Sequence, residues 1–275
     1  MQKTFDVEGP IRLEIDLAVG DIDVDATLDG KAEVELIAHD EESERLLEAA
    51  RVEFANGRLL IDVPKKRSGF SFAIVFGQSG ITCRVRCPEG SDVTTRTKSA
   101  DVRVRGTVGS LSAATASGDT SAQHVRGDVQ LKSASGDLGV SEAQGNVSAQ
   151  TASGDVEIGV ARGKVTANSA SGDVSIGEAY GDVTVNTVSG DQQHGAVMRG
   201  RVTAQAVSGD VVIAVRRGSK AHLDCSTVSG DTSSELDSID APNGDGPLVE
   251  IRAKTVSGDI RITRAHAPAT EEVQA

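Results

Sequence analysis

A tripeptide, Ser-Gly-Asp, returns along the chain at a nearly constant interval, and this regularity leaves few architectures open. It occurs eight times in 275 residues; the first five copies are 18 residues apart, and the later intervals are 19, 21 and 28 residues. The copies begin at Ser117, Ser135, Ser153, Ser171, Ser189, Ser208, Ser229 and Ser257. A fixed period of this kind indicates a repeat protein, in which each repeat packs only against its neighbours.

Each repeat contains two short alternating segments. Val156 and Ile158 are apolar while Asp155 and Glu157 are polar, and glycine occurs every nine residues from 109 to 190. Alternation with a period of two, bounded by glycine, is typical of a β-strand with one buried face. We therefore predict an all-β fold, a single-stranded parallel β-solenoid (β-helix) of 18-residue coils, in which each strand pairs with its copy one coil later.

The two ends depart from this period. Residues 1–95 are rich in alternating segments but irregular, and we predict that they form a β-rich N-terminal cap. One short helix is expected near 41–50, with Asp40 as its N-cap. The solenoid is predicted over 96–264 with a loop insertion near 240–247, and a disordered tail over 265–275.

Composition narrows the possible partners and the compartment. The net charge of −13 argues against nucleic acid, because an acidic surface repels a phosphate backbone. Cys83, Cys87 and Cys225 are read as free thiols, because an odd number in a long chain does not imply a disulfide framework. No apolar run approaches the roughly 20 residues of a membrane-spanning helix, and residues 1–20 do not resemble a secretory signal. A cytoplasmic location is therefore expected.

The Ser-Gly-Asp corners are expected to be structural. Glycine is predicted there because a corner with positive φ disfavours any side chain, and each aspartate is predicted to bond backbone N–H groups of its own turn. Calcium binding by the stacked aspartates is the alternative, but no cofactor or metal is predicted. The corner residues are Gly118, Asp119, Gly136, Asp137, Gly154, Asp155, Gly172, Asp173, Gly190 and Asp191.

A hydroxyl residue begins the tripeptide that leads into most corners, as Thr151 does in Thr-Ala-Ser. Such residues are expected to form hydrogen bonds within the corner. A flat outward array, as in ice-binding solenoids, is the alternative.

The segment 64–80 is the least typical of the chain. It carries three phenylalanines, Phe70, Phe72 and Phe76, after a basic cluster of Lys65, Lys66 and Arg67. Even spacing of the rings favours a hairpin strand packed on the cap. The alternatives are an exposed surface for a protein partner or for self-association, and contact with a membrane.

Catalysis finds no support in the sequence. The histidines share no repeat position, and no Ser-His-Asp, Cys-His, phosphate-loop or metalloprotease spacing is present. Aromatic residues are only 2% of the chain, which leaves few rings to stack on a sugar substrate. We predict that the protein is not an enzyme.

The Ser-Gly-Asp corners followed by Val-x-Ile strands resemble the bacterial putative-adhesin family of β-strand-repeat proteins. The opening QKTFDVEGPIRLEIDLAVGDIDV and the passage ITCRVRCPEGSDVTTRTKSADV are similar to that family too. The resemblance covers residues 1–264, implies no catalytic residues, and through some relatives suggests a link with envelope stress. A non-catalytic binding or scaffolding protein with a rigid acidic surface is predicted; a self-assembling filament, an envelope-stress protein and a calcium-binding roll are the alternatives.

Overall fold

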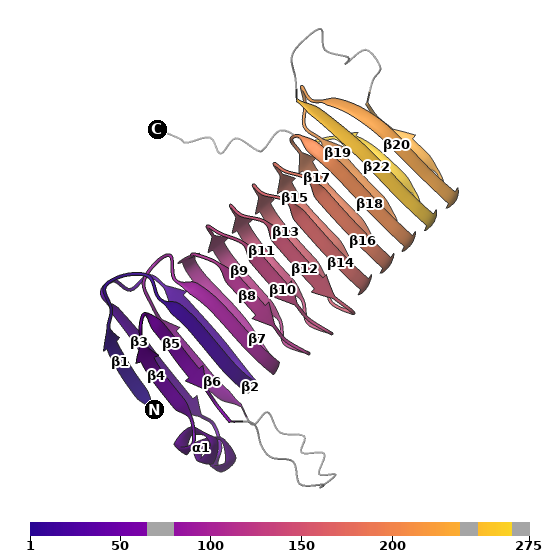
Figure 1. Ribbon diagram of the computed structural model, residues 1–275. Coiled ribbons are helices and arrows are strands. Elements are labelled where there is room, and N and C mark those ends of the chain that lie inside the picture. Colours follow the sequence, from indigo (N-terminus) through magenta and orange to yellow (C-terminus); the bar gives the residue numbers. More distant parts are fainter. Residues whose placement is uncertain (65–79, 237–246, 266–275) are drawn as a thin grey trace, which may run out of the picture.

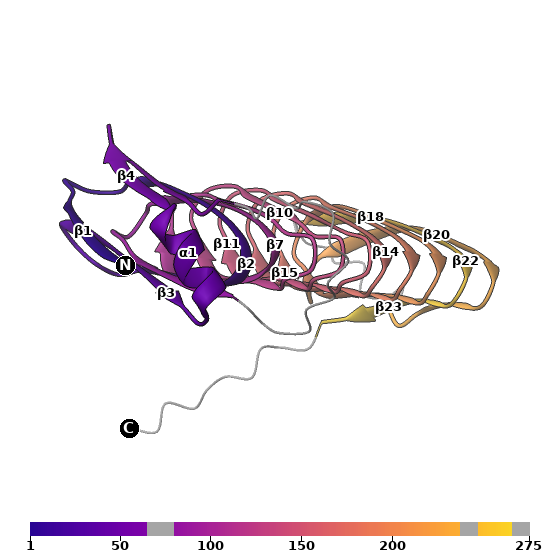
Figure 2. The ribbon, with the colours of Figure 1, turned by 90° about the horizontal axis from the view of Figure 1, so that it is seen from below.

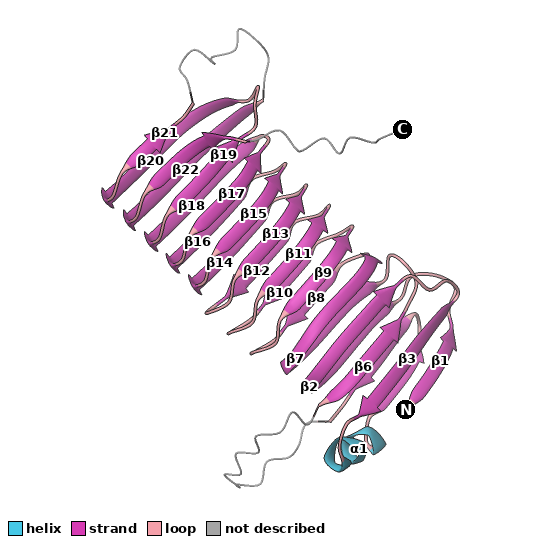
Figure 3. Cartoon of the chain, turned by 180° about the vertical axis from the view of Figure 1, so that it is seen from behind, coloured by secondary structure: helices cyan, strands magenta, loops and turns pink. Residues whose placement is uncertain are grey.

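The structure is a computed structural model, and it describes residues 1–64, 80–236 and 247–265. Within these ranges the chain forms 23 strands and one short helix (Figure 1). The all-β prediction is confirmed, and most of the strands stack in parallel into a solenoid-like rod (Figure 3). The predicted tail, apart from Ala265, and nearly all of the predicted loop near 240–247 lie outside the described residues.

Two stacks of parallel strands make the central part of the rod. The first stack, whose strands begin at the Ser-Gly-Asp corners, contains β9 (Thr120–Val125), β11 (Leu138–Ala143), β13 (Val156–Ala161), β15 (Val174–Ala179), β17 (Gln192–Val197) and β19 (Val211–Val215). The second stack contains β8 (Leu111–Ala114), β10 (Val129–Lys132), β12 (Val147–Thr151), β14 (Val165–Ser171), β16 (Val183–Ser189) and β18 (Gly200–Ser208). The pairing is in register with the repeat, because Val129 pairs with Val147 and Val147 with Val165.

The core is a set of inward-facing columns between the two stacks. Ile158 pairs with Ile176 in the next coil, and both side chains are almost completely buried. Outward-facing positions on the same strands are half-buried or exposed, so the alternation in the sequence separates core from surface. The core is therefore narrow and built from Val, Ile, Leu, Ala and Thr side chains.

At the N-terminal end the chain runs outward and then returns. The strands are β1 (Gln2–Asp6), β2 (Arg12–Ala26), β3 (Lys31–Ala38), β4 (Arg51–Ala55), β5 (Arg58–Asp62), β6 (Ile81–Arg86) and β7 (Asp92–Val108). β2 pairs in parallel with β7 on one side and with β5 and β6 on the other. Beyond these, β4 pairs with β5, β3 with β6 and β1 with β3, all antiparallel. The parallel stacking therefore ends here in antiparallel strands.

The helix α1 (Glu41–Glu48) lies at this same end (Figure 2). The carboxylate of Asp40 accepts a hydrogen bond of 2.7 Å from the backbone N–H of Ser43, which makes Asp40 the N-cap. The helix is where the sequence places it, and Leu47 packs into the core.

The C-terminal end also departs from chain order. It contains β20 (Lys220–Ser229), β21 (Thr232–Ser234), β22 (Leu248–Ser257) and β23 (Ile260–Arg264). β22 lies between β18 and β20 (Figure 3), and β23 pairs with β19 on one side and β21 on the other. The last described strands of the chain are thus inserted beneath an outermost coil that precedes them in sequence.

The corner glycines are required for a reason other than the predicted one. The predicted positive φ is absent at five of these corners, which are Gly118, Gly136, Gly154, Gly172 and Gly190. Instead, a Cβ atom at Gly154 would lie 2.1 Å from the carbonyl oxygen of Gly136, one coil away. Close approach of neighbouring backbones excludes a side chain at these corners. Gly209, with a φ of +145°, does adopt the predicted region.

Two polar side chains interrupt the apolar core on β17. His194 stands between Ile176 and Ile213, and Gln192 is the next inward residue on the same strand. Gln192 donates to the hydroxyl of Thr187 and to the carbonyl of Gln205. Neither ring nitrogen of His194 has a hydrogen-bond partner among the described residues. Burial lowers the pKa of His194 from 6.5 to about 4.

Replacing this histidine should stabilise the protein, most of all in mild acid. Between pH 6.5 and 4 the unfolded chain binds a proton at His194 that the folded chain does not, so stability falls as the pH is lowered. From pH 7.5 to 5 this loss is about 2 kcal/mol for one such group. We expect His194→Ile, which matches its column neighbours, to remove that loss, as measured by urea unfolding at both pH values. Equal pH dependence in the two proteins would contradict the assignment.

Candidate functional site

The aspartates of the Ser-Gly-Asp corners form a ladder of hydrogen bonds from coil to coil. Oδ1 of Asp137 accepts from the backbone N–H of Asp155 at 2.9 Å, and Oδ1 of Asp155 accepts from that of Asp173 at 2.8 Å. The prediction that each aspartate bonds a backbone N–H of its own turn is therefore wrong, because the N–H that it binds belongs to the next coil. Each side chain satisfies the corner of the following coil, because stacking places that N–H within reach of the carboxylate.

The ladder runs without a break along the rod. In spatial order it joins Asp101, Asp119, Asp137, Asp155, Asp173, Asp191, Asp210, Asp259 and Asp231. The last three show that the inserted strand β23 takes its place in the ladder. The described residues contain no group of three or more His, Cys, Asp or Glu side chains placed to hold a metal ion.

The opposite corner uses the same device with mixed residue types. Oδ1 of Asp128 accepts from the N–H of Asn146, and Oδ1 of Asn146 accepts from the N–H of Lys164. The bond therefore requires a short side-chain oxygen and not a negative charge.

The hydroxyl column is confirmed as part of the corner. The N–H of Gly118 donates to the hydroxyl of Thr115, and the N–H of Gly154 donates to that of Thr151 at 3.0 Å. Thr151 is itself buried. These hydroxyl groups satisfy backbone donors at the turn, which does not fit an outward-facing array.

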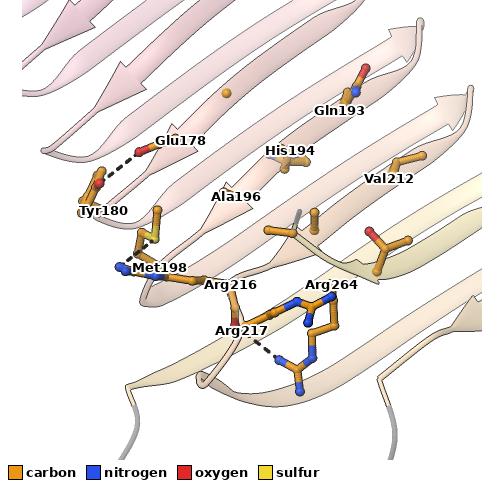
Figure 4. A pocket seen from close by; sticks show the side chains of 15 residues that line it. Glu178, Tyr180, Gln193, His194, Ala196, Met198, Val212, Arg216, Arg217 and Arg264 are labelled. Carbon is orange, nitrogen blue, oxygen red and sulfur yellow. Dashed lines mark hydrogen bonds between the residues drawn. The ribbon is translucent and has the colours of Figure 1, made fainter. Parts of the chain in front are cut away.

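A wide hollow lies on the outer face of the first stack. It measures about 830 Å³ and is bordered by β15, β17, β19 and β23 (Figure 4). Its volume is in the range of sites for small ligands. The lining residues are Gly177, Glu178, Tyr180, Gln193, His194, Gly195, Ala196, Met198, Val212, Ala214, Arg216, Arg217, Thr263, Arg264 and Ala265.

Three arginines from two strand ends are among the residues that border this hollow. Arg216 and Arg217 follow β19, and Arg264 ends β23 (Figure 4). A guanidinium nitrogen of Arg264 donates to the carbonyls of Arg216 and Ser219, at 3.4 and 3.2 Å. Within the described ranges, neither Arg216 nor Arg217 forms a salt bridge, and Arg216 contacts the sulfur of Met198 at 3.5 Å. Arg216 and Arg217 thus carry positive charge at the border of the hollow, on a chain of net charge −13.

The floor of the hollow is made of small or apolar residues. Gly177 and Gly195 are adjacent in the stack, and a Cβ atom at Gly195 would lie 2.7 Å from the carbonyl oxygen of Gly177. Backbone approach therefore excludes side chains at both positions and leaves a depression there. Val212 and Ala214 continue the floor on β19. Val212 faces outward at a position that Gln193 and Ser175 occupy in the preceding coils.

The far side of the hollow carries one carboxylate, Glu178, and one aromatic ring, Tyr180. The hydroxyl of Tyr180 donates to the carboxylate of Glu178 at 3.0 Å, and this bond raises the pKa of Tyr180. The guanidinium of Arg162 stacks over the Tyr180 ring at 5.1 Å. Figure 4 shows Glu178 and Tyr180 on the opposite side of the hollow from Arg217 and Arg264.

Of the histidine that lines this hollow and of the two buried thiols, none presents a reactive atom to it. The imidazole of His194 is buried on the inner face of β17, and the two thiols of β6 and its flank lie in the N-terminal part. Burial raises the pKa of Cys83 to about 12 and that of Cys87 to about 11, so these thiols are poor nucleophiles. What the hollow offers is charge, shape and an apolar floor, which are properties of a binding site.

The sequence-predicted surface of Lys65, Lys66, Arg67, Phe70, Phe72 and Phe76 lies outside the described residues. The hollow was not predicted from the sequence. The sequence feature that could have indicated it is the run Val211-Val212-Ile213, which breaks the apolar–polar alternation. The pair Arg216-Arg217 follows after two further residues.

Fold and corners together define a parallel β-solenoid stabilised by stacked Ser-Gly-Asp turns. A family profile matches residues 11–263, and the chain belongs to the Toastrack DUF4097 family. The predicted resemblance to putative-adhesin proteins is confirmed. Within the described residues no helix is long and apolar enough to cross a membrane.

Several solved structures are similar over nearly their whole length. A putative adhesin from Bacteroides fragilis NCTC 9343 is 15% identical, with 95% of this chain and 97% of that chain covered and a TM-score of 0.48. A putative adhesin from Parabacteroides merdae ATCC 43184 is 13% identical, with 96% of each chain covered and a TM-score of 0.49. A putative lipid binding protein from Parabacteroides distasonis ATCC 8503 is 14% identical, with 96% of each chain covered and a TM-score of 0.44. A comparison with curated proteins found no match.

The aspartate ladder makes a prediction that separates its hydrogen bond from its charge. Asp155→Ala removes the acceptor for the N–H of Asp173 and should lower the free energy of unfolding by about 0.5–2 kcal/mol. Asp155→Asn keeps the acceptor and removes one of a column of like charges, so it should be neutral or stabilising, most clearly at low salt. Urea unfolding at low and high ionic strength measures both. Equal destabilisation by the two substitutions would show that the carboxylate charge itself is required.

Proposed function

We propose that the protein is a non-catalytic binding protein of the cytoplasm, in which a rigid, acidic solenoid of 18-residue coils presents one positively charged ligand site. Residues 1–95 act as a cap that closes the N-terminal end of the core. The arginine-rimmed hollow on β15, β17, β19 and β23 is the binding site, and its ligand carries a negative charge.

The observation that supports this proposal is the position of Arg216 and Arg217, which border the hollow and form no salt bridge with a described residue. The one carboxylate in the lining, that of Glu178, accepts a hydrogen bond from the hydroxyl of Tyr180. Guanidinium groups suit carboxylate and phosphate ligands because their planar fork can donate two parallel hydrogen bonds.

Inorganic phosphate tests the site without assuming a particular ligand. We expect phosphate to raise the melting temperature of the wild type more than that of Arg216→Gln/Arg217→Gln, because an anion bound to the folded state stabilises it. Arg84→Gln/Arg86→Gln, which removes two exposed paired arginines of β6, is the matched control and should respond like the wild type. An equal phosphate response in all three proteins would reduce the effect to a general action of the salt and contradict the proposal.

Self-association is a second candidate, and the C-terminal end supports it. The inward residues of the outermost strand β20, such as Leu223 and Cys225, are only half-buried, whereas Ile251 and Ala253 in the coil beneath are buried. In this proposal the antiparallel strands and α1 cap the N-terminal end. With one open end, two copies would join end to end through β20 and stop, because no second open end remains to extend a filament.

This candidate predicts a finite dimer. Sedimentation velocity over a wide concentration range should show a monomer–dimer equilibrium, and Leu223→Lys should shift it to monomer by placing a charge in the joint. Continued growth of the sedimentation coefficient with concentration would support a filament. A monomer at every concentration would contradict both forms of association.

A further inference from the structure

We infer that the ligand of the arginine-rimmed hollow is a single-headed amphiphilic anion: a carboxylate or phosphate group attached to an unbranched apolar chain. This inference rests on the proposed binding function and adds the chemical class of the ligand. It follows from three properties of the hollow, which are the placement of its positive charge, the nature of its floor and the position of its one carboxylate.

The charged end of the ligand belongs beside Arg216 and Arg217. Arg217 lies beside Arg264, whose guanidinium donates to the carbonyls of Arg216 and Ser219, and the guanidinium of the adjacent Arg216 reaches the sulfur of Met198 (Figure 4). Two guanidinium groups without salt-bridge partners offer enough donors for all the oxygens of one carboxylate or phosphate.

The rest of the ligand must be apolar and thin. The floor offers Gly195, Ala196, Val212 and Ala214, which present few hydrogen-bonding groups to a ligand. Because Gly177 and Gly195 cannot carry a side chain, the depression they form is a fixed feature of the backbone. Val212 is the strongest evidence for an apolar ligand, because the same outward position holds the polar residues Gln193 and Ser175 in the preceding coils. An apolar residue at an otherwise polar surface position indicates contact with something apolar.

The carboxylate of Glu178 limits how far negative charge can extend. It lies across the hollow from Arg217, beside Tyr180 (Figure 4). A polyanion that spanned the hollow, such as an acidic peptide or a nucleic acid strand, would bring charge against Glu178. A ligand charged at one end only satisfies the arginines and leaves an uncharged chain on the side of Glu178.

A series of fatty carboxylates of increasing length tests this inference on the full chain. We expect isothermal titration calorimetry to show at least about tenfold tighter binding of octanoate than of acetate, because burial of two methylene groups is sufficient for that change. Octan-1-ol, which has the chain without the charge, should not bind measurably. The Arg216→Gln/Arg217→Gln variant should lose octanoate binding.

Val212→Gln isolates the role of the floor, because glutamine occupies the equivalent position in the neighbouring coil and is compatible with the fold. It should weaken octanoate binding severalfold and leave the response to phosphate unchanged. Val188→Thr, at an exposed valine on the second stack, is the matched control and should bind octanoate like the wild type.

The outcomes separate the two levels of the proposal. Arginine-dependent binding of phosphate and acetate without any gain from chain length would overturn the amphiphile and leave the proposed anion site standing. Octanoate binding that survives loss of both arginines, or that Val188→Thr weakens as much as Val212→Gln does, would overturn the amphiphile at this site. Failure of phosphate and of every carboxylate would overturn both.

Discussion

Close stacking of neighbouring backbones at the Ser-Gly-Asp corners is the constraint on which the rest of the structure depends. The carbonyl oxygen of one corner glycine lies where the next coil's Cβ would be, as Gly136 shows for Gly154. Only glycine permits this spacing, and the spacing in turn brings the Asp137 carboxylate to the N–H of Asp155. Glycine and aspartate thus act as one unit: the first sets the distance between coils and the second satisfies the backbone donor that this distance leaves at the corner.

The same ladder explains how the ends of the solenoid can depart from chain order. A corner bond between coils depends on which coil is adjacent in space and not on which is adjacent in sequence. The strand β23 can therefore enter between β19 and β21, with Asp259 bonded to Asp210 on one side and Asp231 on the other. At the N-terminal end, where the motif is missing, β2 is paired on its outer side by β5 and β6, which lead into antiparallel strands.

The sequence was sufficient to predict the central part of this fold, because the periods of two and 18 residues report burial and stacking directly. It was sufficient for α1 as well, since Asp40 and the acidic first turn are local signals. The direction of the aspartate bond was not predictable, because an acceptor for its own turn and one for the next coil give the same repeat. The hollow was not predictable either: its arginines come from the ends of β19 and β23, and these meet only because β23 is inserted out of order.

Positions that depart from the repeat are the best candidates for function, because the residues that follow the repeat are explained by packing and by the corner hydrogen bonds. Around β17 and β19 they occur on both faces of the sheet. Inward, Gln192 and His194 replace apolar core residues, and the ring nitrogens of His194 gain no partner among the described residues in return. Outward, Val212 replaces a polar residue and Arg216 follows at the rim of the hollow. A protein departs from its own consistent pattern mainly where function requires it, and here the departures from two faces of the sheet coincide at β17 and β19.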